Sequence, residues 1–549
     1  MIPVAVVEDR TSSMDSPNQK LHQGYTLLSQ GHTAEALALA TTLTAAHPTN
    51  ADVLAFATEA HLANGDPRAA LQSADQAVAA SDGQPALKLM KARVLMHLRR
   101  RSEVAELALE VAAQAGKDDS LIRQAGKLLG SCNRLDEAIA QYERARGLVG
   151  DQPDLLYQLA VARFFNGDFE QAERDLDKQL RIKPRAGHAL YRRATLRTQT
   201  RERNHVADIE RILVAGFREP AHEAWAQYAL GKELEDLGEH EKAFAAFTAG
   251  ARKLRGTLRY NVADEVAALR AVCEAWTKQV MARPDAGCND EGAIFIVGMP
   301  RTGTTLVERL LVQSGKVRSS GELPDFGNLF GTAAWALVAD DPASPSSAQA
   351  STGIDFAALG RDYMRGAREA ANGSARFIDK TPFNFLYCGP IRKALPHARI
   401  IHLTRHPLDC CYAVYKTLFY SAYNFSYDLD ELAEYYIAYH ETMRHWHEVM
   451  PGQILDIRYE DLVNDTENQT RRIYEWCGLE WNPQVLVAPI DKVAFKTASA
   501  AQVREPVHRR SVNSADRHRE RLAPLIRKLV AAGIVAEQAA RGAQGEGMM

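Results

Sequence analysis

Short polar stretches interrupt the apolar segments of the first half of the chain every 34 residues, with a slightly longer last interval. Each stretch carries one turn residue: Gly31, Gly65, Arg99, Asn133, Gly167, Arg201 and Gly238. Five residues after each turn stands a small residue: Ala36, Ala70, Val104, Ala138, Ala172, Val206 and Ala243. Seven residues before each turn stands another: Gly24, Thr58, Ala92, Gly126, Ala160, Ala194 and Gly231. Small residues on both sides of a turn let two antiparallel helices approach closely. Because one such pair cannot bury its apolar stripe alone, the pattern predicts stacked helix pairs.

The period, the small residues and two prolines, Pro48 and Pro184, resemble the tetratricopeptide repeat over roughly residues 17–255. The resemblance implies an all-α solenoid over residues 17–285, after a disordered N-terminus at 1–16. The Arg99 and Arg201 units lack glycine, which adopts φ > 0 most easily. Repeat type fixes shape rather than ligand, so a scaffold, a dimer surface and a partner-binding groove all stay open.

The pattern changes after the turn-rich polar segment 282–292. Short β-rich apolar runs then alternate with helical stretches, at 293–297, 398–404 and 453–459. This alternation predicts a parallel sheet with helices on both faces. We expect an α/β domain over 290–535 and a disordered tail at 536–549.

Composition narrows the class of protein. The 549 residues suffice for two or more domains, and a net charge of −3 gives no sign of broad binding to nucleic acid or membranes. Seven scattered cysteines form no CxxC pair and argue against a disulfide framework. No secretory signal is evident, and no apolar run approaches the ~18 residues of a membrane span. We expect a cytoplasmic protein.

The sequence GMPRTGTT follows the first β-rich run and nearly matches the nucleotide-binding pattern G-x4-G-K-[ST]. Gly298 and Gly303 permit the tight turn, and amides at a helix N-terminus stabilise an anion. Thr304 replaces the lysine that bridges β- and γ-phosphates, while Arg301 supplies charge from within the loop. The loop therefore suits a 5′-phosphate without a transferable γ-phosphate.

A second anion site is predicted where Arg405 ends the second run and Pro407 begins the next helix. Two separate phosphate sites on one sheet indicate a nucleotide that carries both 5′- and 3′-phosphates.

At this point the sequence resembles the sulfotransferases that use 3′-phosphoadenosine 5′-phosphosulfate (PAPS), in particular bacterial members with N-terminal tetratricopeptide repeats related to protein-tyrosine sulfotransferases. The resemblance implies a tetratricopeptide-repeat solenoid followed by an α/β, P-loop-like sulfotransferase domain. It covers about residues 292–530 and rests on motifs in a fixed order: PRTGTT (300–305), GEL (321–323), DKTPFN (379–384), RHPLD (405–409), YEDLV (459–463) and TASAAQVREPV (497–507).

The resemblance implies roles for individual residues. Arg405 would hold the 3′-phosphate, and Tyr459 would close over the nucleotide. The residues of the first motif that would hold the 5′-phosphosulfate are Arg301, Thr302, Gly303, Thr304 and Thr305. The residues that would close over the nucleotide with Tyr459 are Ser499, Gln502, Val503 and Arg504. The family usually has a serine where this chain has Ala413, and Tyr412 or Lys416 are candidates to compensate.

The family match makes Glu322 the general base, and Lys380 with Arg301 the groups that neutralise the reacting anion. Without the motif context, Glu322 reads as a carboxylate at a helix N-terminus and Lys380 as a surface partner of Asp379. No metal is required by this scheme. His440, His445 and His447 do not form an HExxH motif, so we interpret them as a solvated helix face.

The leading hypothesis is thus an enzyme that moves the sulfuryl group of PAPS to a hydroxyl and releases adenosine 3′,5′-bisphosphate (PAP). The alternatives are an inactive partner-binding adaptor and a nucleotide kinase, against which the missing loop lysine counts. A protein tyrosine, a sugar, a lipid and a small phenol all remain open as acceptors. The repeats would hold a protein or peptide acceptor, or join two chains as a homodimer.

Overall fold

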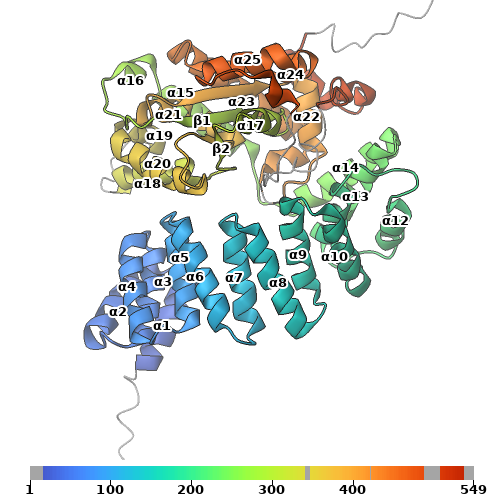
Figure 1. Cartoon of the computed structure of the whole chain (residues 1–549). Helices are drawn as coiled ribbons and strands as arrows, with labels where there is room; N and C mark the ends of the chain where they lie inside the picture. The colour runs from blue at the N-terminus through green and yellow to red at the C-terminus, as the bar shows by residue number, and fades with distance from the viewer. Residues whose placement is uncertain (1–16, 340–345, 421, 488–506, 537–549) are drawn as a thin grey trace, which may run out of the picture. The chain divides into compact units, whose positions relative to one another are not determined.

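The computed structural model describes residues 17–339, 346–420, 422–487 and 507–536 (Figure 1). The chain divides into two compact units, Met1–Leu155 and Leu156–Met549. None of the helices in these described ranges is long and apolar enough to cross a membrane. The predicted disordered ends, residues 1–16 and 536–549, fall outside the described residues except for Ala536.

The first unit consists of antiparallel helix pairs, as the 34-residue period predicts. Its helices are α1 (Pro17–Ser29), α2 (Thr33–Ala46), α3 (Ala51–Ala63), α4 (Pro67–Ala80), α5 (Pro85–His97), α6 (Arg101–Gln114), α7 (Asp119–Ser131) and α8 (Leu135–Val149). Asn50 and Asp66 cap α3 and α4 by accepting hydrogen bonds from main-chain amides of the first turn.

Two of the predicted small positions lie where helices pack closely, within a pair at Gly126 and between neighbouring pairs at Gly24. A Cβ atom at Gly24 would lie 2.2 Å from the Phe56 ring, and one at Gly126 would lie 2.9 Å from Tyr142. Six of the seven predicted turn residues have positive φ, including Arg99 at 61° and Asn133 at 64°, which replace glycine there. The repeat prediction is confirmed at these six turns.

The paired helices continue in the second unit. They are α9 (Pro153–Asn166), which spans the unit boundary, α10 (Phe169–Ile182), α11 (Gly187–Thr195), α12 (Val206–Val214), α13 (Pro220–Asp236) and α14 (His240–Arg255), followed by α15 (Val262–Ala275) and α16 (Lys278–Ala282). The prediction of a regular turn at Arg201 is wrong, because α11 ends at Thr195 and α12 begins only at Val206.

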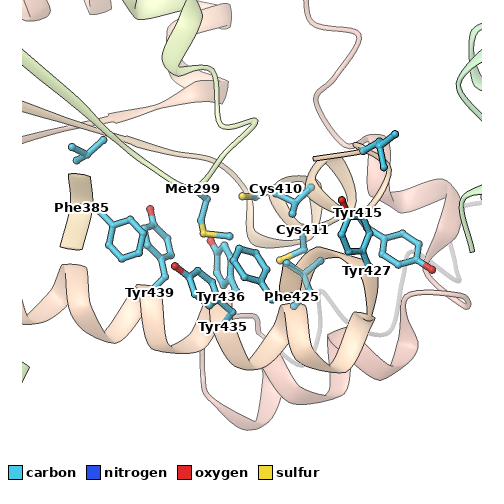
Figure 2. Packing of buried hydrophobic residues seen from close by; sticks show 14 of the residues in the cluster. Met299, Phe385, Cys410, Cys411, Tyr415, Phe425, Tyr427, Tyr435, Tyr436 and Tyr439 are labelled. Atoms are coloured by element: carbon cyan, nitrogen blue, oxygen red, sulfur yellow. The ribbon is translucent and has the colours of Figure 1, made fainter. Parts of the chain in front are cut away.

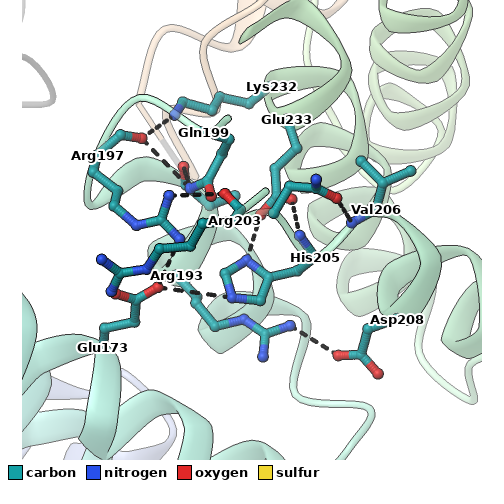
Figure 3. Close-up of polar contacts among 12 residues, drawn as sticks. Glu173, Arg193, Arg197, Gln199, Arg203, His205, Val206, Asp208, Lys232 and Glu233 are labelled. Carbon is teal, nitrogen blue, oxygen red and sulfur yellow. Dashed lines mark hydrogen bonds and ion pairs between the residues drawn. The ribbon is translucent and has the colours of Figure 1, made fainter. Parts of the chain in front are cut away.

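A polar network replaces that turn (Figure 3). The buried Glu173 carboxylate accepts hydrogen bonds from Arg197, at 3.0 Å, and from Arg203. The Glu233 carboxylate, which is fully buried, bonds to the main-chain amide and the ring of His205, at 2.5 and 2.9 Å. Two buried carboxylates require these donors, and the irregular loop supplies them at the expense of the turn.

The α/β domain is built on a five-stranded parallel sheet in the order β2-β3-β1-β4-β5. Its strands are β1 (Ala293–Gly298), β2 (Arg318–Ser319), β3 (Phe377–Asp379), β4 (Arg399–Thr404) and β5 (Ile454–Arg458). The three predicted runs form β1, β4 and β5. The sequence did not predict β2 and β3 as strands, because two and three residues are too short to show a period.

Both faces of the sheet are packed, because alternate residues of β1 belong to two separate hydrophobic clusters. The helices of the domain are α17 (Thr304–Val312), α18 (Asp325–Ala339), α19 (Ser347–Ala350), α20 (Phe356–Ala370), α21 (Cys388–Ala394), α22 (Pro407–Tyr415), α23 (Leu429–Val449), α24 (Tyr459–Asn464), α25 (Thr466–Trp476) and α26 (Ala523–Ala531). Shorter 3₁₀ segments are η1 (Ser351–Gly353), η2 (Pro382–Tyr387), η3 (Asn424–Tyr427), η4 (Pro483–Leu486) and η6 (Ser514–His518).

One continuous core joins the last repeats to the α/β domain. Tyr228 of α13 donates a hydrogen bond to the Tyr415 carbonyl, at 3.1 Å, and the Leu418 amide donates to the Tyr191 hydroxyl of α11, also at 3.1 Å. Phe244 of α14 stacks on Tyr412. Figure 2 shows the aromatic side chains that continue this core along α23. The predicted end of the repeats at residue 285 and the predicted start of the α/β domain at residue 290 therefore stay predictions.

This packing predicts where the chain can be cut. A fragment of residues 156–549 should unfold in one cooperative transition, because it keeps the continuous core. A fragment of residues 290–549 should aggregate, because it exposes the apolar surfaces that Phe244 and Tyr228 cover. Circular dichroism and calorimetry measure both outcomes. A 290–549 fragment as stable as 156–549 would contradict this description.

Candidate active site

The predicted phosphate loop lies between β1 and α17, on the central strand of the sheet. Three of its residues have positive φ: Gly298 at 143°, Arg301 at 68° and Gly303 at 105°. A Cβ atom at Gly303 would lie 2.6 Å from the Tyr459 ring, and one at Gly298 would lie 2.6 Å from the Leu403 carbonyl oxygen. Only glycine fits at these two positions, and the strained backbone of Arg301 is typical of a functional site.

The threonines of the loop are buried at the start of α17, at 1%, 4% and 5% exposure for Thr302, Thr304 and Thr305. The Thr302 hydroxyl donates to the Met299 carbonyl at 2.8 Å, which stabilises the turn. The first amides of α17 have no partner within the helix and are suited to an anion.

Arg405 lies beside this loop, as the two-phosphate hypothesis requires. Its side chain is buried, donates to the Arg301 carbonyl at 3.0 Å and to the Ser511 carbonyl, and lies over the Tyr459 ring at 5.0 Å. Among the described residues, its Nε atom is buried without a hydrogen-bond partner. Burial lowers the pKa of Arg301, and the nearby charge of Arg405 lowers it further. An anion bound between these two neighbouring guanidinium groups would stabilise the charge of Arg301.

Lys380 and Glu322 come together at the carboxyl ends of β3 and β2. Main-chain pairing continues past the strands, because the Lys380 amide donates to the Gly321 carbonyl at 2.9 Å. The Lys380 ammonium, 2% exposed, forms an ion pair with the Glu322 carboxylate, which is 37% exposed. Lys380 therefore pairs with Glu322 and not with Asp379, and α18 begins only at Asp325.

Asp379 has other partners. It accepts hydrogen bonds from Tyr363 at 2.8 Å, Thr381 at 2.6 Å and Asn384 at 3.1 Å. Burial raises the pKa of this carboxyl to about 6, although the hydrogen bonds oppose the shift. Asp379 thus fixes the main chain on both sides of Lys380 from within the core.

Sequence reasoning missed a second carboxylate near Lys380. Glu308 of α17 is buried and accepts a hydrogen bond from the Ser319 hydroxyl, which in turn accepts one from the Gly321 amide at 2.9 Å. Burial raises the pKa of Glu308, and the positive charge of Lys380 opposes the shift. Through Ser319, Glu308 stabilises the turn that precedes Glu322. The sequence around Glu308 is that of an ordinary helix and did not indicate this role.

The structure assigns Tyr412 and Lys416 to a contact with the repeats. The Tyr412 hydroxyl donates to Glu235 of α13 at 2.9 Å, and the Lys416 ammonium bonds both oxygens of that carboxylate, at 2.7 and 2.8 Å. Burial opposes the charge on Glu235, but Lys416 and Tyr412 more than offset this, so its pKa is lowered. The suggestion that either side chain replaces the serine missing at Ala413 gains no support from these contacts.

The segment after the predicted closing motif is fixed to α22. Asp409 accepts hydrogen bonds from the Asn513 amide at 2.7 Å, the Ala515 amide at 2.8 Å and the Ser514 hydroxyl at 3.1 Å. The four residues predicted to close over the nucleotide lie outside the described residues: Ser499, Gln502, Val503 and Arg504.

Known families match both halves of this architecture. Residues 293–483 match the model of the "Sulfotransferase family", and residues 153–185 match the "Tetratricopeptide repeat". The chain therefore combines tetratricopeptide repeats with a sulfotransferase-family domain, as the resemblance predicted. The matched region contains the phosphate loop, Glu322, Lys380, Arg405 and Tyr459.

Individual relatives are distant. The chain is 30% identical to an "Uncharacterized protein" of Aquifex aeolicus (strain VF5) over 310 residues, 55% of this chain but only 41% of that protein. It is 24% identical to a "Putative protein-tyrosine sulfotransferase" of Caenorhabditis briggsae over 238 residues, 41% of this chain and 81% of that protein.

Similar solved structures include the sulfotransferase domain of the Synechococcus PCC 7002 olefin synthase, with a TM-score of 0.31, 18% identity, and coverage of 42% of this chain and 90% of that one. They also include YrrB, a TPR protein with an unusual peptide-binding site, with a TM-score of 0.27, 20% identity, and coverage of 32% of this chain and 91% of that one.

The crowded loop predicts a specific loss of stability. Gly303→Ala should lower the free energy of unfolding by at least about 2 kcal/mol, because it combines a strained φ with a clash against the Tyr459 ring. Gly315→Ala, where φ is 68° and a Cβ atom meets nothing within 4 Å, should cost only about 1 kcal/mol. Denaturant unfolding compares the two, and equal losses would show that Tyr459 does not pack against the loop.

Proposed function

We propose that the protein transfers the sulfuryl group of PAPS to a hydroxyl group of an acceptor. The observation that carries this proposal is the ion pair between the buried Lys380 ammonium and the partly exposed Glu322 carboxylate, in a domain that also holds the strained phosphate loop and matches the sulfotransferase family. Transfer of a sulfuryl group to a hydroxyl requires a base for the proton of the hydroxyl and a cation for the developing negative charge, and these two groups lie side by side here.

The described residues fit a nucleotide that carries phosphates at two positions. The loop amides and Arg301 would bind the 5′-phosphosulfate, and Arg405 would bind the 3′-phosphate with Tyr459 beside it. Three features support this assignment: the Arg405 Nε atom without a partner among the described residues, the lowered pKa of Arg301, and a loop that only glycine can complete at Gly303. Thr302, Thr304 and Thr305 lie at the same helix start.

The donor supplies an activated sulfuryl group, and the rest of the chemistry falls to side chains. The acceptor oxygen forms a bond to sulfur while the bond from sulfur to the 5′-phosphate oxygen breaks. Glu322 accepts the acceptor proton, and Lys380 donates a hydrogen bond to the oxygen that gains charge. An anion beside Lys380 competes with Glu322 for the ammonium, which frees the carboxylate to act as base. No metal ion is needed for these steps, since Arg301 and Lys380 supply positive charge.

For the acceptor we favour a hydroxyl on a protein or peptide, with tyrosine as the first candidate. Support comes from the name of the Caenorhabditis briggsae relative and from the repeats, since stacked repeats form extended binding surfaces. The seven cysteines are all free, in keeping with a reducing compartment, so we propose a cytoplasmic location. A homodimer held by the repeats remains the other use that we propose for them.

Donor recognition is tested by calorimetry. PAP should bind without Mg²⁺ and more tightly than ATP with Mg²⁺, because the loop lacks the lysine that bridges β- and γ-phosphates. Arg405→Ala should weaken PAP binding through the loss of a charged partner. ATP binding that equals or exceeds PAP binding would favour the kinase alternative.

The catalytic base is tested by turnover. Glu322→Gln should lower kcat by about 10²–10⁴-fold while PAP affinity barely changes, because the amide keeps the shape but cannot take a proton. Glu467→Gln, which alters an exposed carboxylate on α25, is the matched control and should leave both values unchanged. Near-normal turnover in Glu322→Gln would assign the proton transfer to another group.

A further inference from the structure

Three potential metal ligands meet at the edge of the sheet, on the side that α23 covers. They are His402 of β4, Asp456 of β5 and His447 of α23, and one ligand atom of each lies within 4.8 Å of the others. The His402 Nδ1 atom lies 2.7 Å from one Asp456 oxygen, and the His447 Nε2 atom lies 3.1 Å from the other. The register of the sheet places His402 directly opposite Asp456.

His402 is a fixed anchor for this cluster. Its side chain is 5% exposed, and its second nitrogen, Nε2, lies 2.5 Å from the Tyr439 hydroxyl. The Tyr439 hydroxyl also hydrogen-bonds to the main chain of Met299, at the start of the phosphate loop. Figure 2 shows Tyr439 and Met299 close together in the aromatic core. A partner on the remote nitrogen is the arrangement that orients histidine ligands in metal proteins.

The other two ligands lie where an ion can enter. The His447 side chain is 35% exposed and Asp456 is 50% exposed, so both can move toward an incoming ion while His402 stays in place. In a tetrahedral zinc site with bonds of ~2.0–2.2 Å, neighbouring ligand atoms stand roughly 3.3–3.6 Å apart. The two histidines contact different oxygens of Asp456, at 2.7 and 3.1 Å, and the three ligand atoms lie within 4.8 Å of one another, so the two exposed side chains have to adjust around the ion to reach that spacing.

We propose that His402, Asp456 and His447 bind one first-row transition metal ion, with Zn²⁺ as the best fit. Two imidazole nitrogens and one carboxylate oxygen are a ligand set that such ions accept, and water takes the remaining position. On binding, the ion takes the place of the hydrogen between His402 Nδ1 and Asp456. The neutral ring then carries its single hydrogen on Nε2, where the Tyr439 oxygen accepts it, and any second proton of the ring is released to water.

The ion would fasten α23 to the two strands at that edge of the sheet. β5 is the edge strand of the described sheet and pairs there with β4 alone. An ion shared by His447 of α23 and Asp456 of β5 would give this strand a second attachment. The site is separate from the proposed transfer reaction, and its consequence is a gain in stability by mass action. The sequence alone did not predict this metal site, because its three ligands come from positions 402, 447 and 456 on three different elements.

The test is a metal titration of the full-length protein after dialysis against a chelator. Co²⁺ and Zn²⁺ should each bind at one site per chain, with a Co²⁺ visible spectrum typical of nitrogen and oxygen ligands, and Zn²⁺ should raise the unfolding temperature. His447→Ala and Asp456→Asn should each weaken Zn²⁺ binding by about tenfold or more. PAP affinity should remain unchanged in both variants, which separates this proposal from the proposed function.

His440→Ala is the matched control, because His440 is an exposed histidine on the same helix and outside the cluster. It should bind Zn²⁺ like the natural chain. Three results would overturn the proposal: no saturable binding, equal binding by the His447→Ala and natural chains, or a sulfur-to-cobalt absorption band that assigns the ion to cysteine. Circular dichroism establishes that each variant is folded before its affinity is compared.

Discussion

The candidate site depends on one buried charge, the ammonium group of Lys380. At 2% exposure this group cannot rely on water, so the chain has to bring a carboxylate to it. The short pairing of β2 with β3 does this, because it continues to Gly321 and places Glu322 beside Lys380. Asp379 and Glu308 fix the two main-chain segments from inside. Two strands of only two and three residues are therefore enough to fix the proposed base and the proposed cation side by side.

The last repeats are structural parts of the unit that contains the α/β domain. Glu235 of α13 holds Tyr412 of α22, the helix that follows Arg405, and Lys416, which directly follows that helix, while Tyr228 and Phe244 are part of the core beneath it. The same 34-residue period thus serves two purposes along one chain. Up to Leu155 its helix pairs belong to the first compact unit, and beyond that point they share one core with the α/β domain.

Much of the fold could be predicted because it depends on local periodicity. A turn that needs positive φ was predicted at Asn133 and Arg99, although neither is glycine, because the interval between units set their positions. The same reasoning failed at Arg201. Two buried carboxylates, Glu173 and Glu233, determine the structure there, and no local pattern reveals that they are buried.

The phosphate loop and Arg405 were predictable from local pattern, whereas the roles of Glu322 and Lys380 were predictable only through resemblance. Glu322 and Lys380 are far apart in sequence, and their pairing depends on strands too short to recognise. Glu308 and the His402 cluster were missed for the same reason: each draws on residues from separate elements that only the folded chain brings together.

The central claim is that this arrangement moves a sulfuryl group with the help of Lys380. The most direct test incubates the protein with PAPS radiolabelled in the sulfuryl group and a cell lysate, beside a Lys380→Ala chain shown to be folded. The account predicts that label passes to a macromolecular acceptor with the natural chain and falls by at least about 10²-fold with the variant. No labelled acceptor with the natural chain, or equal labelling by both chains, would contradict it.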